Sequence, residues 1–168
     1  MVSTPATVAL TRLGLPFQTH TYAHDPSVSA YGQEAADATG VEPERIFKTL
    51  LVDTGRTLAV GIVPVSGSLD LKAVAAALCV KKVTMAEPAV AERSTGYVVG
   101  GISPVGQRKA LPTVIDESAR GFETVFVSGG RRGFEIELAP DDLAAATGGT
   151  FATISRERLP AGSRAAPP

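Results

Sequence analysis

The chain has 168 residues, 44% of them hydrophobic, with a formal net charge of -1 and a single cysteine, Cys79. This length suits one compact domain with a sizeable core, and the balanced charge argues against a strongly basic nucleic-acid-binding protein, although a local basic patch could still contact RNA. One cysteine excludes an intrachain disulfide, and no Cys/His cluster has metal-ligand spacing, so we expect a cytoplasmic protein without a structural metal or other cofactor. We expect neither export nor membrane insertion, because no basic start precedes an apolar core and no apolar run approaches about 18 residues.

The first half of the sequence alternates predicted helices and strands. Ser3 or Thr4 caps a first helix that has Pro5 in its first turn and ends at Gly14. Further helices are predicted over residues 33–39, 70–78 and 88–93. Strands are predicted over residues 17–22, 47–52, 57–65 and 83–85, with a turn at residues 53–56 that makes the second and third of them a β-hairpin.

The second half is richer in predicted strands. These cover residues 97–99, 113–115, 124–127, 134–138 and 151–154, and one helix is predicted over residues 140–146. Many strands with few long crossovers predict an α+β domain over residues 1–156, with a mixed, largely antiparallel, barrel-like sheet flanked by short helices. The proline-rich remainder, residues 157–168, is expected to be a poorly ordered tail.

The run Gly100-Gly101-Ile102-Ser103-Pro104-Val105-Gly106 directly follows the predicted strand 97–99. Its glycines and proline give a backbone shape that few side chains tolerate, with exposed N–H groups that a ligand can approach closely. It lacks the Gly-Lys-Ser/Thr ending of a phosphate-binding loop and the glycine spacing of dinucleotide sites. On turn chemistry alone it is a tight connection between strands, and a binding loop is the alternative.

Lys48 is the residue whose surroundings are most unusual in the sequence. It lies in a strand whose two faces are otherwise mostly apolar, so core or pocket walls should surround its aliphatic stem. Burial would favour the neutral amine and a neighbouring carboxylate the ammonium. The functional interpretation is a cation or amine in a pocket, and the alternative is an ammonium that extends from a strand end to solvent.

A second glycine-rich run, residues 128–133, joins the predicted strands 124–127 and 134–138. It is either a wide hairpin with solvated arginines or, if strands 97–99 and 124–127 are neighbours, a rim that brings Gly100, Gly101 and Ser128 together. Period-two alternation puts Glu135 and Glu137 on the same face of their strand. One of them could face inward toward Lys48, or both could be solvated.

Several basic residues fall near predicted strand ends and loops. A subset on one face would bind the phosphates of an RNA, although each is more commonly a solvated surface charge. They are Arg45, Lys72, Lys81, Lys82, Arg108, Lys109, Arg131 and Arg132.

The order and spacing of several segments, over about residues 5–155, resemble the YbaK/EbsC family, and most of all its YbaK branch. Those segments are His20-Thr21-Tyr22, Phe47-Lys48-Thr49-Leu50-Leu51, Lys81-Lys82-Val83, Ser94-Thr95-Gly96-Tyr97, the run from Gly100 to Gly106 and Val127-Ser128-Gly129-Gly130. The family includes freestanding proteins and the related insertion domain of bacterial prolyl-tRNA synthetases, and its members remove wrongly attached amino acids from tRNA. The resemblance implies release of cysteine from Cys-tRNA(Pro), with Cys-tRNA(Cys) as a further substrate, and a transient complex with prolyl-tRNA synthetase.

The resemblance also implies roles for individual residues. Lys48 matches the family lysine, and Gly100 and Gly101 match the glycines beside the scissile ester, so these three are the candidate catalytic residues. The implied substrate-binding residues are Tyr22, Tyr31, Thr49, Ser128 and Glu135. Tyr31 stands where many members carry phenylalanine, and Glu135 where we expect aspartate in some relatives, which leaves open whether Glu135 contacts a ligand or is structural.

The chemistry of an aminoacyl ester fits this residue set. Such an ester is already activated, so a protein needs orientation and a donor for the developing carbonyl charge more than a strong nucleophile. No convincing Ser/His/Asp arrangement occurs, and Cys79, in an apolar helical stretch, is expected to be an inert core thiol. With the resemblance, this favours attack by the substrate's own thiol and release of a thiolactone.

Other functions stay open at this point. A noncatalytic tRNA- or synthetase-binding module would keep the fold and the basic loops. An unrelated enzyme could use Lys48 as a Schiff-base amine. A deacylase of the same kind could also prefer a different amino acid.

Overall fold

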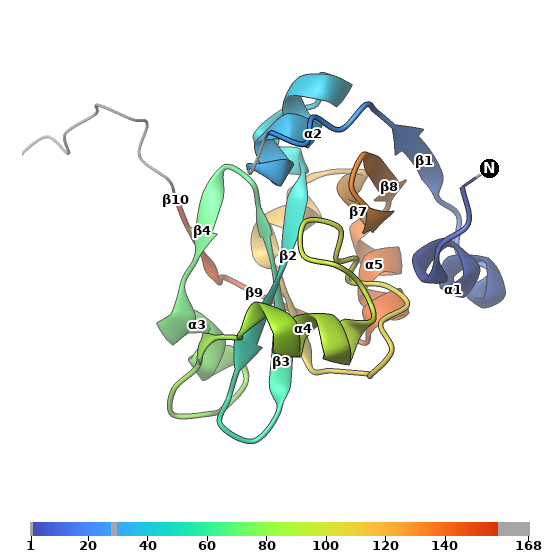
Figure 1. Ribbon diagram of the computed structural model, residues 1–168. Coiled ribbons are helices and arrows are strands. Elements are labelled where there is room, and N and C mark those ends of the chain that lie inside the picture. The colour runs from blue at the N-terminus through green and yellow to red at the C-terminus, as the bar shows by residue number, and fades with distance from the viewer. Residues whose placement is uncertain (1, 28–29, 158–168) are drawn as a thin grey trace, which may run out of the picture.

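Five α-helices, two short 3₁₀ helices and ten strands form within residues 2–27 and 30–157, the residues that the computed structural model describes (Figure 1). The α-helices are α1 (Pro5–Leu13), α2 (Tyr31–Thr39), α3 (Leu71–Ala77), α4 (Pro88–Thr95) and α5 (Pro140–Thr147), and the 3₁₀ helices are η1 (Pro43–Arg45) and η2 (Glu117–Gly121). The strands are β1 (Gln18–Thr21), β2 (Phe47–Asp53), β3 (Leu58–Pro64), β4 (Gly67–Leu69), β5 (Thr84–Met85), β6 (Thr113–Asp116), β7 (Val125–Arg131), β8 (Phe134–Leu138), β9 (Thr150–Ala152) and β10 (Ser155–Glu157).

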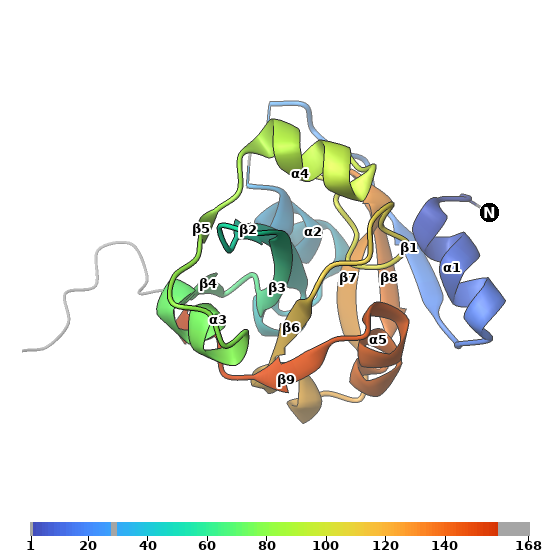
Figure 2. The same cartoon turned by 90° about the horizontal axis from the view of Figure 1, so that it is seen from below.

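The strands form three sheets, ordered β5-β2-β3-β6-β9, β1-β8-β7 and β10-β4. The pairings β3 with β6 and β6 with β9 are parallel, and the other pairs of strands are antiparallel. A parallel bridge between Ile46 and Phe126 links the two larger sheets, which lie side by side in Figure 2. The predicted α+β class and the mixed, largely antiparallel sheet are therefore confirmed.

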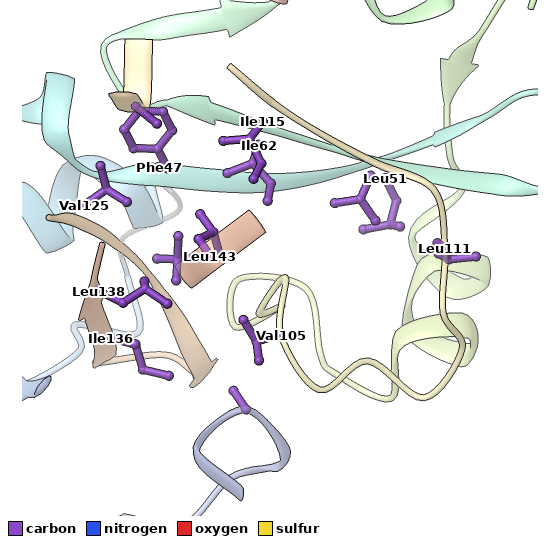
Figure 3. Packing of buried hydrophobic residues seen from close by; sticks show 14 of the residues in the cluster. Phe47, Leu51, Ile62, Val105, Leu111, Ile115, Val125, Ile136, Leu138 and Leu143 are labelled. Carbon is purple, nitrogen blue, oxygen red and sulfur yellow. The ribbon is translucent and has the colours of Figure 1, made fainter. Parts of the chain in front are cut away.

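The main core fills the space between the two larger sheets. Phe47, Ile62 and Val125 from the strands, together with Leu143 from α5, point into this shared space (Figure 3). A second core lies on the other face of the five-stranded sheet, where Val63 packs with Val74 of α3. Because both faces of β3 are covered, every residue of this strand is buried, as the apolar run in its sequence indicated.

The helix boundaries follow the capping residues. The Thr4 side chain accepts a hydrogen bond from the Thr7 N–H at the start of α1, and Asp70 does the same for Ala73 at the start of α3. Gly14 and Gly40 end α1 and α2 in the left-handed conformation, with φ of 69° and 72°. The predicted helix starts and stops at these positions are confirmed.

The strand predicted over residues 97–99 is wrong. Gly96 ends α4 with φ of 80°, and residues 97–99 continue as a loop held by the Tyr97 hydroxyl, which donates to the Val105 carbonyl at 2.7 Å. The run from Gly100 to Gly106 therefore follows a helix rather than a strand. Tyr97 and Val105 are buried, so side chains rather than sheet pairing fix this segment, which we call the glycine loop (residues 97–106).

The second glycine run is also not a hairpin loop. Strand β7 continues to Arg131, and the register with β8 shifts between Ser128 and Arg131, which marks a β-bulge. The remaining turn is Arg132-Gly133, where Gly133 has φ of 80°. Because of the bulge, β7 includes residues 128–131, which the sequence predicted to be part of a loop because of their glycines.

Three further points concern Cys79, the end of the chain and membrane insertion. Cys79 is exposed and follows α3 with φ of 57°, so the expected core position of its thiol is wrong. Glu157 is the last residue of β10, and the rest of the predicted tail, residues 158–168, lies outside the described residues. Within the described ranges, no helix combines the length and apolar character needed to span a bilayer.

Candidate active site

A cavity of about 430 Å³ opens between β2, the start of α2, the glycine loop, α4 and the ends of β7 and β8. Strand β5 pairs with β2 only at Val52 and Asp53, so the earlier part of β2 borders the cavity. The polar residues of its wall are Tyr22, Tyr31, Gln33, Lys48, Thr49, Ser128, Arg132 and Glu135. The volume is in the range of small-molecule sites, and the wall combines apolar side chains with a few polar ones.

Strand β2 contributes Lys48 and Thr49 to the wall. Lys48 pairs in register with Val63 of β3, and Thr49 pairs with Ile62. Backbone pairing with the buried strand β3 therefore fixes one edge of β2. The Thr49 hydroxyl is buried and has no hydrogen-bond partner within the described residues. A rigid strand thus presents a cation and a hydroxyl to the cavity.

Glu135 is the only carboxylate among the described residues that line the cavity. Glu135 stands on the central strand β8, where it pairs with Ser128 of β7 on one side and with His20 of β1 on the other, and it is only 8% exposed. Burial raises the pKa of its carboxyl to about 8, and its Oε2 atom has no hydrogen-bond partner in the part of the chain that the structure describes. At neutral pH this carboxyl therefore holds a proton and can donate a hydrogen bond to a ligand.

Tyr22 closes the strand β1 beside the cavity. Its N–H donates to the Gly133 carbonyl at 2.9 Å, which ties the segment after β1 to the β7–β8 turn. Burial, and then the nearby Glu135 and Glu34 carboxyls, raise the pKa of its hydroxyl to about 12. Tyr22 is consequently a neutral hydrogen-bonding group at any pH near 7.

The rim of the cavity is built by Tyr31 and Arg132. The Arg132 guanidinium lies 4.6 Å from the centre of the Tyr31 ring, and its Nη2 atom donates to the Val99 carbonyl at 2.8 Å. The ring of His24 lies 5.9 Å from that of Tyr31, and its Nδ1 atom lies 2.6 Å from a Glu34 carboxylate oxygen. These contacts hold α2, the glycine loop and the β7–β8 turn together around the opening.

Gly100 and Gly101 serve this rim in different ways. Gly100 lines the cavity with φ of 92°, and a Cβ atom there would lie 2.6 Å from Arg132 Nε and 2.8 Å from a Tyr31 ring carbon. Gly101 is buried behind the wall, where a Cβ atom would lie 2.8 Å from Arg131 Cα. Its N–H donates to the Val98 carbonyl at 2.8 Å, whereas Gly100 lines the cavity itself.

Comparison with known proteins shows which family the chain belongs to. Residues 25–146 match the model of the aminoacyl-tRNA editing domain. The chain belongs to this family. The YbaK/EbsC resemblance of the sequence is thereby confirmed, and by family membership this editing domain is an aminoacyl-tRNA deacylase.

Two curated relatives and two solved structures are similar over most of their length. A protein of Enterococcus faecalis named "Putative Cys-tRNA(Pro)/Cys-tRNA(Cys) deacylase EbsC" is 41% identical over 124 residues, 73% of this chain and 76% of its own. YwhH of Bacillus subtilis, which is uncharacterized, is 30% identical over 69% of this chain and 74% of its own. A crystal structure described as "a putative trans-editing enzyme for prolyl tRNA synthetase" has a TM-score of 0.78 at 26% identity, covering 93% of this chain and 99% of its own. That of the hypothetical protein APE2540 has a TM-score of 0.80 at 26% identity, covering 91% and 100%.

The structure brings most of the sequence-predicted site residues together in this editing domain. All of them line the cavity except Gly101, which supports the wall from behind. Gly100 and Ser128 do meet at one cavity, although no strand over residues 97–99 is there to align them. In the described ranges, no three His, Cys, Asp or Glu side chains gather as metal ligands would.

The predicted basic residues do not all remain available to a nucleic acid. Arg45 donates to Glu137 at 2.9 Å and to the Thr124 carbonyl, and it also lies over the Phe126 ring. Arg132, by contrast, belongs to the cavity wall, whereas its neighbour Arg131 does not. The sequence could not separate the two, because both stand in the same glycine-rich run. His24 and Glu34 were not predicted at all, and ten residues of sequence separate the partners of this contact.

Proposed function

We propose that this editing domain acts in trans to release cysteine mischarged onto tRNA(Pro), and also acts on Cys-tRNA(Cys). The observation that carries the proposal is a cavity with a lysine, four hydroxyl groups and a protonated carboxyl in its wall, but no cysteine or histidine among its described lining residues. The name of the 41% identical relative, a putative Cys-tRNA(Pro)/Cys-tRNA(Cys) deacylase, supports the choice of amino acid and tRNA. The prolyl-tRNA synthetase partner named for the solved relative supports a transient complex with that enzyme.

The chemistry then comes from the substrate. The cysteine thiol attacks its own ester carbonyl, a C–S bond forms, the bond to the ribose oxygen breaks, and a thiolactone leaves. The thiol proton ends on the ribose oxygen. We assign its transfer to Glu135, which lines the cavity: its protonated carboxyl gives its proton to the ribose oxygen as the C–O bond breaks and takes the thiol proton on its other oxygen, so the carboxyl is restored after each turnover.

The remaining polar groups have roles in orientation and charge. Lys48 holds the terminal adenosine region or stabilises the negative charge that develops on the carbonyl oxygen, and the Gly100 N–H is the backbone donor for that charge. The Thr49 and Ser128 hydroxyls and the rings of Tyr22 and Tyr31 surround the aminoacyl group. Gly101 contributes by keeping the glycine loop close to Arg131.

A panel of mischarged tRNAs tests the proposal. Wild-type protein and Lys48→Ala are incubated with Cys-tRNA(Pro), Cys-tRNA(Cys), Ser-tRNA(Pro) and Ala-tRNA(Pro), and release of the amino acid is measured. We expect rapid loss of cysteine from wild type, little loss of serine, and strongly reduced turnover by Lys48→Ala. Equal turnover of cysteine and serine would exclude thiol assistance, and tRNA binding without turnover of any ester would favour the noncatalytic module. A borohydride-trapped adduct at Lys48 would favour Schiff-base chemistry.

A further inference from the structure

Arg132 is a cation at the cavity rim that the editing reaction described above does not use. It stands in the turn between β7 and β8, it is exposed, and it lines the cavity together with Tyr31, Val99 and Gly100. Lys48, which is half-buried on β2, and Glu135, 8% exposed, lie further from solvent than Arg132. The cavity wall therefore carries one cation inside and one at the opening.

The orientation of Arg132 is fixed from two sides. Its guanidinium lies over the Tyr31 ring at 4.6 Å, and its Nη2 atom donates to the Val99 carbonyl at 2.8 Å. Gly100 makes this possible, because a Cβ atom there would come within 2.6 Å of Arg132 Nε. A guanidinium has five N–H donors in a planar fork, and the bond to Val99 engages one of them. A pre-oriented fork of this kind matches the oxygens of a phosphate group.

The substrate carries a phosphate one ribose away from its reacting end. In an aminoacyl-tRNA the ester is on one side of the terminal ribose and the phosphodiester to the preceding nucleotide is on the other. An ester placed beside Lys48, Gly100 and Glu135 leaves the ribose spanning toward the opening. We propose that Arg132 binds this last phosphodiester and so positions the ester in the cavity, an inference that rests on the proposed deacylase function.

The test compares substrates with and without that phosphate. Cysteine is esterified to tRNA(Pro), to 5′-AMP and to adenosine, which lacks the phosphate, and KM and kcat are measured for wild type, Arg132→Gln and Arg132→Lys. We expect Arg132→Gln to raise KM for Cys-tRNA(Pro) and the AMP ester by about tenfold, with little change for the adenosine ester. Arg132→Lys should fall between, because it keeps the charge but not the fork.

Two control variants separate direct contact from net charge. Arg131→Gln removes the same charge one residue away, outside the cavity wall, and should raise the KM of the AMP ester less than Arg132→Gln does. Arg56→Gln, in the exposed β2–β3 turn, reports the effect of losing any surface arginine.

The outcomes distinguish this proposal from the function on which it rests. An equal loss on all three esters would mean that Arg132 only organises the glycine loop, and an Arg132→Gln variant indistinguishable from Arg131→Gln would mean that it acts through net charge. Either result overturns the proposal while the deacylase function stands. Absence of turnover by wild type on every cysteine ester would overturn the proposed function itself.

Discussion

Two buried oxygen atoms in the cavity wall, Thr49 Oγ1 and Glu135 Oε2, have no hydrogen-bond partner within the described residues. A buried polar atom without a partner destabilises a fold by about 1–3 kcal/mol, and a bound ligand that supplies the partner recovers that free energy. The cavity is thus prepared for a ligand with polar atoms at this depth. An aminoacyl ester, with its amine and carbonyl, is such a ligand.

The protonation of Glu135 makes stability depend on pH in an unusual direction. Burial raises its carboxyl pKa from 4.5 to about 8, so the folded protein holds a proton that the unfolded chain releases above about pH 4.5. The free energy of unfolding should therefore fall as pH rises from 4.5 to 8, by up to about 5 kcal/mol from this group. Urea unfolding of Glu135→Gln at several pH values should show that part of the slope removed.

Glu137 provides the matched control on the same strand. Burial raises its carboxyl pKa, but hydrogen bonds from Thr124 and His20 and the charge of Arg45 outweigh burial and lower it. Its contribution is therefore present above its unfolded pKa and is lost as pH falls, the opposite sign. Parallel stability curves for wild type and Glu135→Gln would show that Glu135 is already ionised in the fold.

Single residues differ in how far the sequence reveals their role. Lys48 stands out because a charge interrupts an apolar strand, and that signal needs no knowledge of the fold. Tyr31 came only from the family resemblance, since a tyrosine in a polar segment is ordinary, whereas the second glycine run already singled out Ser128 before the resemblance gave it a role. Arg132 looks like its neighbour Arg131 in the sequence, and only the turn geometry and the Tyr31 ring separate them.

At the scale of elements, helix α1 is held to the sheet through its cap. The Thr4 hydroxyl donates to the Gly129 carbonyl in the bulge of β7 and accepts from the Thr7 N–H, while Thr7 Oγ1 accepts from the Thr4 N–H. Thr4→Ala should lower the free energy of unfolding in urea by about 1–2 kcal/mol, because it removes both the cap and the bond to the bulge. Ser3→Ala, at an exposed neighbouring position, should change it little, and equal effects would contradict the role of Thr4 as the cap.

Elements defined by local signals were predictable, and those defined by distant contacts were not. Proline, capping residues and a final glycine mark α1 within its own sequence, and the β2–β3 hairpin is marked by its turn. Residues 97–99 have strand-like composition, but the buried Tyr97 side chain and its bond to Val105 hold them as a loop. Strand β7 extends through two glycines because β8 pairs across the bulge, which no local signal shows.

At the scale of the whole molecule, Asp116 joins two of the sheets. It ends β6 at 2% exposure, and its Oδ1 atom accepts from the N–H groups of Ile154 and Ser155, where β10 begins, while Oδ2 accepts from Ser118. Asp116→Ala should lower the free energy of unfolding by about 3 kcal/mol, because two backbone donors lose their acceptor inside the protein. Asp116→Asn keeps an acceptor oxygen and should lose less, as urea unfolding of both variants would show. Equal losses would mean that the charge, not the acceptor, matters.

The overall class was within reach of the sequence, whereas the topology was not. Alternating short helices and strands predict an α+β domain, and that prediction is confirmed. The parallel pairing of β3 with β6 and of β6 with β9 joins segments that lie dozens of residues apart. Strands β4 and β10 are too short to give a recognisable strand pattern in the sequence. The order of strands therefore depends on contacts that no local pattern contains.

The exposed position of Cys79 has a redox consequence for an enzyme whose proposed substrate carries a thiol. Cys79 is the only cysteine of the chain, and it follows α3 rather than lining the cavity. A cysteinyl group bound in the cavity therefore meets no protein sulfhydryl with which it could form a mixed disulfide. Oxidising conditions can therefore modify Cys79 without capturing the substrate, and a fluorophore attached there labels the chain outside the cavity wall.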